Sequence, residues 1–290
     1  MYKNVKHLIP AENINMGGLF IKQALPTQNV PQVDPYLLLH HATLRYNQNA
    51  PAIQQGVGPH PHRGFTPVTF VVEGDVHHRD SRGNNQIAKA GEVQWMHTGA
   101  GIIHSERPSQ ELVDQEGTQE FIQLWVNSPA ANKMQVPEYQ YLTNDDFKIF
   151  TSKDNLVSDK LVAGTYNGQT SKLVTQSPLM ILWSTAQKGG NQDYKISENY
   201  NSMIYVIKGY LNIKNYGPVE EKSLVVFNDS NESEHIQITA KENAQYLILT
   251  GKAIDEPMTQ HGPFVMNNQT EILEAMRDYQ MGKMGILNEE

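Results

Sequence analysis

The feature that most constrains the fold of this chain is a series of short apolar or alternating runs separated by turn residues. Between Leu19 and Trp125 each run is bounded by Gly, Pro, Asn or Asp, and helical periodicity is almost absent. Such runs are typical of strands in a sandwich or barrel, whereas βαβ units need long crossover helices. The clearest runs are LFIKQAL (19–25), YLLLHHATL (36–44), VTFVVEG (68–74), GEVQWM (91–96) and FIQLWV (121–126). The sequence therefore predicts an all-β protein.

A polar stretch over residues 128–155 interrupts this pattern, and similar runs resume after it. They are LMILWSTA (179–186), NSMIYVIKGYLNI (201–213), KSLVVFND (222–229) and AQYLILTG (244–251). The phrase TFVVEGDV (69–76) is similar to IYVIKGYL (204–211), because both read as a strand, a glycine turn and a second strand. We therefore expect two β domains of duplicated architecture, over residues 1–140 and 141–290.

The last segment of the chain has a different pattern, which predicts one short amphipathic helix. Asn268 followed by Glu271 resembles a capping box, and Gly282 is expected to end the helix. The apolar residues that repeat at helical spacing are Ile272, Leu273, Met276 and Tyr279. Their apolar face should pack on one of the β domains.

Charge and cysteine content exclude several classes of function. The chain of 290 residues has 23 Lys and Arg against 31 Asp and Glu, a formal net charge of −8. Because there is no basic excess to neutralise phosphates, direct binding of nucleic acid is not expected. The chain has no cysteine, so disulfides, thiolate zinc sites, iron–sulfur clusters and cysteine nucleophiles are excluded.

The pattern of apolar residues gives no sign of a membrane segment. The N-terminus lacks the continuous apolar stretch of about 7–15 residues found in signal peptides. No apolar run approaches the roughly 20 residues needed to span a bilayer. We expect a cytoplasmic protein with no membrane partner.

Histidines are concentrated in the first half, where two pairs have strand spacing. These pairs are His60-Pro61-His62 and His104-Ser105-Glu106. Side chains at i and i+2 of a strand project from the same face, so two adjacent strands would bring three imidazoles and one carboxylate together. Such ligands suit Fe, Mn, Co, Ni, Cu or Zn, and four of them leave up to two positions open for chemistry.

The remaining histidines carry weaker patterns. His40-His41 and His77-His78 are adjacent in sequence, and surface or loop positions are expected for them. His97 is expected near the pocket, at its rim or behind a ligand. Across the strand-like runs of the second β domain, residues 179–251, only His235 is available, and a lone histidine is more often a surface residue than a ligand. We therefore expect no metal in the second domain and one metal ion per chain.

Several motifs together resemble the pirin family of the cupin superfamily. They are H-P-H-R-G-F (60–65), E-G-x-x-x-H-x-D-S-x-G (73–83), G-E-V-Q-W-M-x-T-G-x-G-I-x-H-S-E (91–106), Q-L-W-V-N-x-P (123–129) and H-G-P-F-V-M-N (261–267). The resemblance implies a bicupin of two antiparallel β-barrels of jelly-roll type, with one metal ion, usually iron, in the N-terminal barrel. It implies the same ligands as the spacing argument, namely His60, His62, His104 and Glu106.

One position departs from the family pattern. Many pirins continue H-P-H-R-G-F with Glu, where this chain has Thr66. The family's metal is not bound by that Glu, so the metal site should remain while the surrounding chemistry differs.

The resemblance to bacterial pirins implies a metal-dependent dioxygenase of the quercetinase type. Such an enzyme opens the heterocycle of a flavonol with O₂ and releases carbon monoxide. Fe(II) is the expected ion, and Glu106 is expected to act as ligand and general base. Continuing the parity of His62 along the strand predicts an apolar wall from Thr66, Val68 and Phe70, unless a bulge at Pro67 changes the parity.

Two other functions remain open at this point. Pirins of higher organisms are described as co-regulators whose iron redox state controls binding of a protein partner, and such a protein would not turn over flavonols. A storage bicupin would bind no stoichiometric metal.

Overall fold

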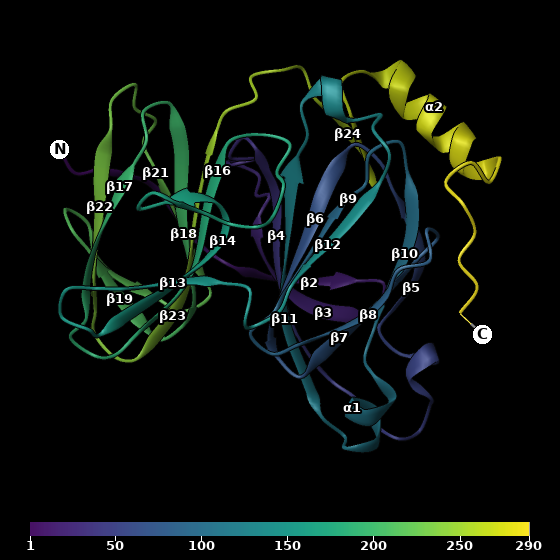
Figure 1. Ribbon diagram of the computed structural model, residues 1–290, viewed down its shortest axis with the longest axis horizontal. Helices are drawn as coiled ribbons and strands as arrows, with labels where there is room; N and C mark the ends of the chain where they lie inside the picture. The colour runs from purple at the N-terminus through teal and green to yellow at the C-terminus, as the bar shows by residue number, and fades with distance from the viewer. Residues whose placement is uncertain (290) are drawn as a thin grey trace. The chain divides into compact units, whose positions relative to one another are not determined.

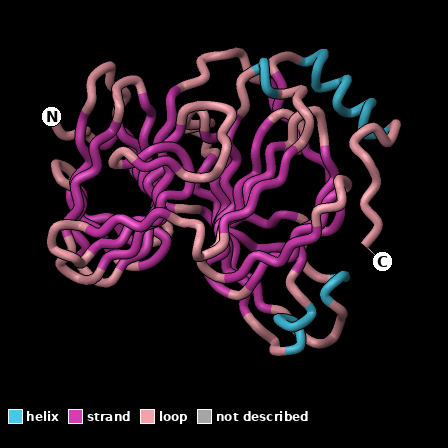
Figure 2. The backbone as a smooth tube through the Cα atoms, viewed as in Figure 1, coloured by secondary structure: helices cyan, strands magenta, loops and turns pink. Residues whose placement is uncertain are grey.

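The computed structural model describes residues 1–289, which fold into two compact units rich in β-strands (Figure 1). We call them the histidine unit, residues 15–21, 38–144 and from 254 on, and the companion unit, residues 1–14, 22–37 and 145–253. Strands account for most of the regular structure and helices for little of it (Figure 2). The predicted all-β architecture is confirmed.

A single division of the chain at residue 140 was expected, but each end of the chain belongs to the opposite unit. The change near the middle falls between residues 144 and 145. However, residues 1–14 belong to the companion unit, because strand β1 (Val5–Pro10) pairs with β21 (Ser223–Phe227). The C-terminal helix belongs to the histidine unit, not to the second β domain.

The histidine unit contains a seven-stranded sheet, a four-stranded sheet and a small hairpin, all antiparallel. The large sheet has the order β12-β9-β6-β11-β4-β3-β2, the small sheet β5-β10-β7-β8, and the hairpin β24-β25. The division between units falls within β2, β3 and β4. The strands are β2 (Glu12–Met16), β3 (Leu19–Leu25), β4 (Tyr36–Arg45), β5 (Val57–His62), β6 (Phe65–Glu73), β7 (Asp75–Asp80), β8 (Asn85–Lys89), β9 (Val93–His97), β10 (Ile102–Arg107), β11 (Thr118–Asn127), β12 (Glu138–Leu142), β24 (Thr259–His261) and β25 (Phe264–Met266).

The companion unit repeats this arrangement with its own large and small antiparallel sheets. The large sheet has the order β1-β21-β18-β23-β16-β14-β13, with β15 paired to β14, and the small sheet has the order β17-β22-β19-β20. The remaining strands are β13 (Lys148–Thr151), β14 (Val157–Tyr166), β15 (Gln169–Thr170), β16 (Leu179–Ala186), β17 (Asn191–Ile196), β18 (Tyr200–Lys208), β19 (Tyr210–Ile213), β20 (Gly217–Glu220), β22 (Glu234–Ala240) and β23 (Ala244–Lys252).

The similar phrases in the two halves occupy equivalent places in the two units. Gly74 lies between β6 and β7, and Gly209 lies between β18 and β19, with φ of 71° and 83°. A Cβ at Gly74 would lie 2.3 Å from the Thr118 carbonyl oxygen, and one at Gly209 would lie 2.2 Å from that of Asn243. The same glycine turn therefore packs against the start of the equivalent strand, β11 or β23, in each unit.

Helix α2 (Gln269–Gln280) forms at the predicted place. The Asn268 side chain accepts a hydrogen bond from the Glu271 amide at 3.0 Å, as a capping residue does. The helix packs against β24 and β25 through Ile272 and Ala275, whereas Leu273 and Tyr279 of the expected apolar face are exposed.

The other helices are short. They are α1 (Gln110–Asp114) and the 3₁₀ turns η1 (Ala52–Gln54) and η2 (Ala130–Asn132). Within residues 1–289, no helix is long and apolar enough to cross a membrane.

Candidate metal centre

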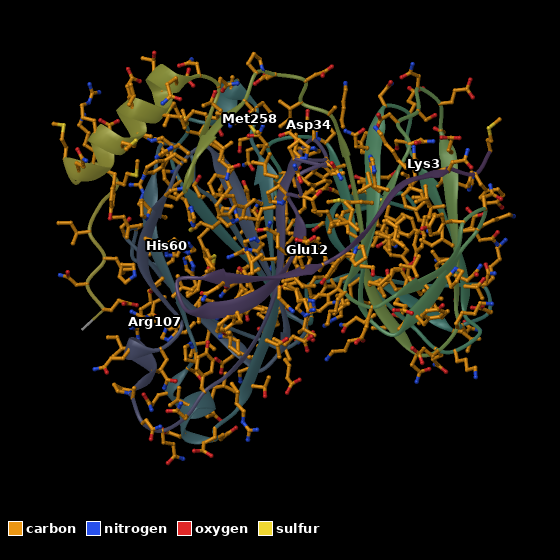
Figure 3. The ribbon with its side chains drawn as sticks, turned by 180° about the vertical axis from the view of Figure 1, so that it is seen from behind. Lys3, Glu12, Asp34, His60, Arg107 and Met258 are labelled. Carbon is orange, nitrogen blue, oxygen red and sulfur yellow. The ribbon has the colours of Figure 1, made fainter. Side chains whose placement is uncertain are left out.

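The two predicted ligand pairs, His60 with His62 and His104 with Glu106, lie on adjacent antiparallel strands, β5 and β10. His104 is directly opposite His60 in the register of these strands. The ring centroids are separated by 4.3 Å for His60 and His104, 4.7 Å for His60 and His62, and 5.0 Å for His62 and His104. One possible ligand atom from each of the three lies within 4.8 Å of the others. Figure 3 labels His60 on β5 and Arg107 at the end of β10.

The hydrogen bonds of these three rings leave their Nε2 atoms available. Nδ1 lies 2.8 Å from the Gly58 carbonyl in His60 and 3.4 Å from the Pro263 carbonyl in His62, so each Nδ1–H donates to a backbone oxygen. In His104, Nδ1 lies 3.4 Å from Nδ1 of His78. The Nε2 atom of His104 is buried and has no hydrogen-bond partner in the described structure. A buried unpaired nitrogen is costly, and a metal ion would satisfy it.

Burial keeps the deeper imidazoles in the neutral form that binds metals. Burial, together with the neighbouring His60, lowers the pKa of His62 well below its usual value. Burial and the surrounding histidines likewise lower the pKa of His104. The donor set therefore fits a divalent transition-metal ion.

A segment distant in sequence holds the strand that carries His62. The Arg63 amide donates to the Pro263 carbonyl, and the Val265 amide donates to the Arg63 carbonyl at 3.0 Å. Gly64 (φ 88°) must be glycine here, because a Cβ would lie 2.0 Å from the Val265 carbonyl oxygen. The motifs at 60–65 and 261–267 are therefore partners in space.

Glu106 faces the same cavity but is held by two polar side chains. Thr69 Oγ1 donates to Oε1 of Glu106 at 2.9 Å. The Gln123 amide lies 3.0 Å from Oε1 and 2.8 Å from Oε2. Glu106 is not part of the compact group of ligand atoms that the three histidines form.

A largely apolar cavity of about 500 Å³ opens beside these residues. Its polar lining consists of His40, His60, His62, Glu106 and Gln123. The apolar lining comes mainly from β2, β3, β4 and β11, and comprises Met16, Leu19, Ile21, Leu38, Ala42, Leu44, Val57, Phe121 and Trp125. A cavity of this size and character suits a small aromatic molecule.

The apolar wall predicted from Thr66, Val68 and Phe70 was wrong, because none of these residues lines the cavity. The turn at Gly64 separates β5 from β6, so the parity of His62 does not continue into β6. Thr69, of the opposite parity, reaches Glu106 instead. Thr66 Oγ1 lies 3.4 Å from Nδ1 of His97, so the departure from the family pattern is outside the cavity lining.

The adjacent histidine pairs are more buried than a surface or loop position would be. His40 lines the cavity, and burial lowers its pKa to about 4. His41 Nε2 lies 2.8 Å from Oε1 of Glu120. His78 is buried beside His104, while its neighbour His77 contacts the Asn85 side chain at 2.6 Å.

His97 does not lie at the rim of the cavity: it is buried and is not among the lining residues. In the companion unit His235 is a surface residue, as expected. Its side chain is 41% exposed and contacts Asp193.

Sequence reasoning missed two features of the site, and each left a signal. Gln123 is the one polar residue on the inward parity of FIQLWV, between Phe121 and Trp125, which both line the cavity. His78 and Asp80 have the same i, i+2 strand spacing as His60 and His62. This spacing puts the side chains of His78 and Asp80 on one face of β7.

Comparisons with known proteins cover nearly the whole chain. The profile of the family described as Pirin matches residues 18–126, and that of the Pirin C-terminal cupin domain matches residues 182–285. The chain is 34% identical over 274 residues to Pirin-like protein 2 of Arabidopsis thaliana, covering 92% of this chain and 81% of that protein. It is 31% identical over 284 residues to the Pirin-like protein of Solanum lycopersicum, covering 97% of this chain and 92% of that protein.

A solved structure is similar to this chain in its fold as well as in its sequence. The quercetin 2,3-dioxygenase from Acinetobacter baumannii is 32% identical, with a TM-score of 0.89 over 98% of this chain and 99% of that one. The expected fold, with two cupin barrels in one chain, is confirmed.

Proposed function

Because this chain belongs to the pirin family, we propose that it is a mononuclear metal-dependent dioxygenase of the quercetinase type. Its substrates would be a flavonol and O₂, and its reaction would open the flavonol heterocycle with release of carbon monoxide. The observation that carries this proposal is a group of three converging imidazoles beside a carboxylate in an apolar cavity of about 500 Å³. The similarity to the quercetin 2,3-dioxygenase of Acinetobacter baumannii supports the reaction type.

In this proposal His60, His62 and His104 hold one divalent ion, with Glu106 as the fourth ligand. Fe(II) is the proposed ion, while the same donors accept Mn, Co, Ni, Cu or Zn. When bound, the ion supplies a Lewis acid that polarises and orients a substrate oxygen.

The cavity walls select and shield a planar aromatic substrate. Trp125 packs against His62 with 5.4 Å between ring centroids, and Phe121 lines the same cavity. Apolar walls exclude water and favour burial of aromatic rings. The flavonol would therefore bind with its rings against β4 and β11 and its oxygens towards the histidines.

Glu106 would accept the proton of the flavonol hydroxyl group. The hydrogen bonds from Thr69 and Gln123 hold its carboxylate in the cavity. Because these partners leave further acceptor capacity on the two oxygens, a substrate hydroxyl can also donate to the carboxylate. A general base positioned in this way typically increases the reaction rate by a factor of about 10²–10⁴.

The test combines metal content with turnover. Protein purified without added metal should contain one ion per chain, and the iron-loaded protein should consume quercetin in air, measured as loss of its visible absorption band. His60→Ala should lose the ion and the activity. His235→Ala is the matched control and should keep both, because His235 is exposed and bound to Asp193. A stoichiometry near two, or metal loss in the His235 variant, would contradict a single site in the histidine unit.

The same experiment separates the enzyme from a regulatory protein. The alternative is a metal- or redox-sensing protein that acts through a protein partner. One bound ion without turnover on a panel of flavonols would favour this alternative.

A further inference from the structure

We propose that His78 and Asp80 form a positioning pair that orients His104 and places a second negative charge beside the metal ion. This inference rests on the proposed metal centre and concerns its electrostatics, not its substrate. Neither residue is among the proposed ligands, and both belong to the motif at 73–83.

Strand β7 brings the pair beside the ligand strand β10. In the register of these strands, Asp80 is opposite His104 and His78 is opposite Glu106. Nε2 of His78 lies 3.0 Å from Oδ2 of Asp80, and Nδ1 of His78 lies 3.4 Å from Nδ1 of His104. All three side chains are buried, with 1–3% of each residue exposed. The contacts form one continuous path from a carboxylate to a ligand.

The path defines where the protons lie. Ionised Asp80 can only accept, so a neutral His78 would donate from Nε2 and keep a lone pair on Nδ1. That lone pair accepts from Nδ1–H of His104, which leaves the His104 Nε2 lone pair for the ion. This agrees with the buried Nε2 of His104, which has no partner in the described structure.

Asp80 is built to stay ionised. Besides His78, its carboxylate accepts from the amides of Arg82 and Asn84 at 2.9 and 3.1 Å and from the Asn84 side chain at 2.7 Å. Every one of these partners donates to the carboxylate, and hydrogen bonds of this kind favour its ionised form. With Glu106, Asp80 would bring the charge of a divalent site to neutrality.

The Nδ1 atom of His104 has a different kind of partner from the Nδ1 atoms of the other two imidazoles. His60 and His62 donate to backbone carbonyls, which carry no net charge. Of these three imidazoles, His104 alone is linked through a side chain to a carboxylate within residues 1–289. Tyr139 also stacks on the His78 ring, with centroids 4.3 Å apart and planes 13° from parallel, which restricts rotation of that ring. The pair is therefore fixed in orientation as well as in charge.

The experiment measures metal affinity and electronic properties rather than activity. Co(II) affinity is determined by competition with a chelator for wild type, His78→Leu, His78→Gln, Asp80→Asn and the control His77→Ala. His78→Leu should weaken binding by about 10–100-fold, since supporting residues of metal ligands have effects of this size. His78→Gln should restore part of the affinity, because its amide oxygen can accept from His104 Nδ1–H. His77→Ala should match wild type.

Two further readouts separate positioning from general packing. The visible spectrum of bound Co(II) should change in His78→Leu. In the iron-loaded protein, Asp80→Asn should raise the Fe(III)/Fe(II) potential, because loss of a nearby negative charge favours the less positive ion. Circular dichroism checks that each variant is folded, and if His78→Leu is not, Asp80→Asn and His78→Gln decide.

The outcomes distinguish this inference from the proposed function. Wild-type affinity in folded His78→Gln and Asp80→Asn, with an unchanged potential, would overturn the pair while leaving the metal centre intact. A wild-type protein that binds no Co(II) or iron would overturn the centre itself and the pair with it. Absence of flavonol turnover would affect only the proposed reaction.

Discussion

At the scale of single residues, Glu106 is the group whose two proposed roles can be separated. In Glu106→Gln the amide oxygen can still accept from Thr69 and Gln123, so the side chain should stay in place. The three imidazoles should retain much of the metal, with weaker affinity because an amide is a poorer ligand than a carboxylate. An amide cannot take the substrate proton, so turnover per bound ion should fall by about 10²–10⁴.

The measurement for Glu106 is activity normalised to bound metal, across pH. If the variant slows only in proportion to its lost metal, Glu106 is a ligand and not a base. Gln123→Leu tests the support of the carboxylate, and it should lower normalised activity while leaving the three imidazoles untouched.

His40 makes the stability of the metal-free protein depend on pH. Burial lowers its pKa to about 4 in the folded chain, whereas in the unfolded chain it is about 6.5. Between pH 6.5 and 4, His40 is therefore protonated in the unfolded state but not in the folded state. The free energy of unfolding decreases as the pH falls towards 4. The expected slope from this residue is up to about 1.4 kcal/mol per pH unit.

Chemical denaturation at several pH values between 7.5 and 4.5 measures this slope. His40→Asn should reduce the slope by about one proton per molecule. His261→Asn is the control, because His261 is exposed and has no burial to lose. Equal slopes for wild type and His40→Asn would show that His40 is protonated in the folded state.

The ligand histidines could be predicted from the sequence because their convergence depends on a local rule. His60 and His62 share a strand face whatever surrounds them. The wall residues could not be predicted, because the parity of His62 does not continue past the turn at Gly64 (φ 88°). A Cβ at this position would clash with the carbonyl of Val265, which is distant in sequence. His40 and His78 were misplaced for a related reason: adjacent histidines carry no local signal of which strand will bury them.

At the scale of elements, helix α2 illustrates what a periodic pattern can and cannot predict. Its limits follow from local chemistry, since Asn268 caps one end and Gly282 (φ 72°) follows the other. Its buried face does not follow from local chemistry. Ile272 and Ala275 pack against β24 and β25, while Leu273 is 58% exposed. Hydrophobic spacing allowed several faces, and only packing selects one.

Two neighbouring alanine substitutions test this choice of face. Ile272→Ala should cost about 2–5 kcal/mol of unfolding free energy, because Ile272 is fully buried. Leu273→Ala should change it by no more than about 0.5 kcal/mol. Urea denaturation of both variants provides the comparison. Equal costs would mean that the helix does not dock on the hairpin through Ile272.

At the scale of the whole molecule, the duplication was visible in the sequence but the exchange of the chain ends was not. The phrases around Gly74 and Gly209 are local and occupy equivalent turns. By contrast, β1 pairs with β21, more than 200 residues away, and α2 packs on strands of the histidine unit. Sequence order carries no information about which sheet edge a terminal strand will complete.

Both units bury enough apolar surface that a bound ion should not be needed for folding. In the companion unit the core includes Tyr194, Tyr246 and Ile248, and in the histidine unit it includes Trp95 and Phe70, all with no residual exposure. A zinc finger differs, because its binding energy is its folding energy. Chelation should therefore leave the β-sheet circular dichroism unchanged at room temperature.

Metal removal should nevertheless lower the melting temperature through linkage. At a metal concentration 100 times Kd, binding contributes about 2.7 kcal/mol, which corresponds to a decrease in Tm of about 5–10 °C on chelation. The same chelator should not change the Tm of His60→Ala, which lacks the site. Scanning calorimetry of both proteins with and without chelator gives the comparison. Loss of the β-sheet spectrum from chelated wild type at room temperature would instead show that the ion is required for folding.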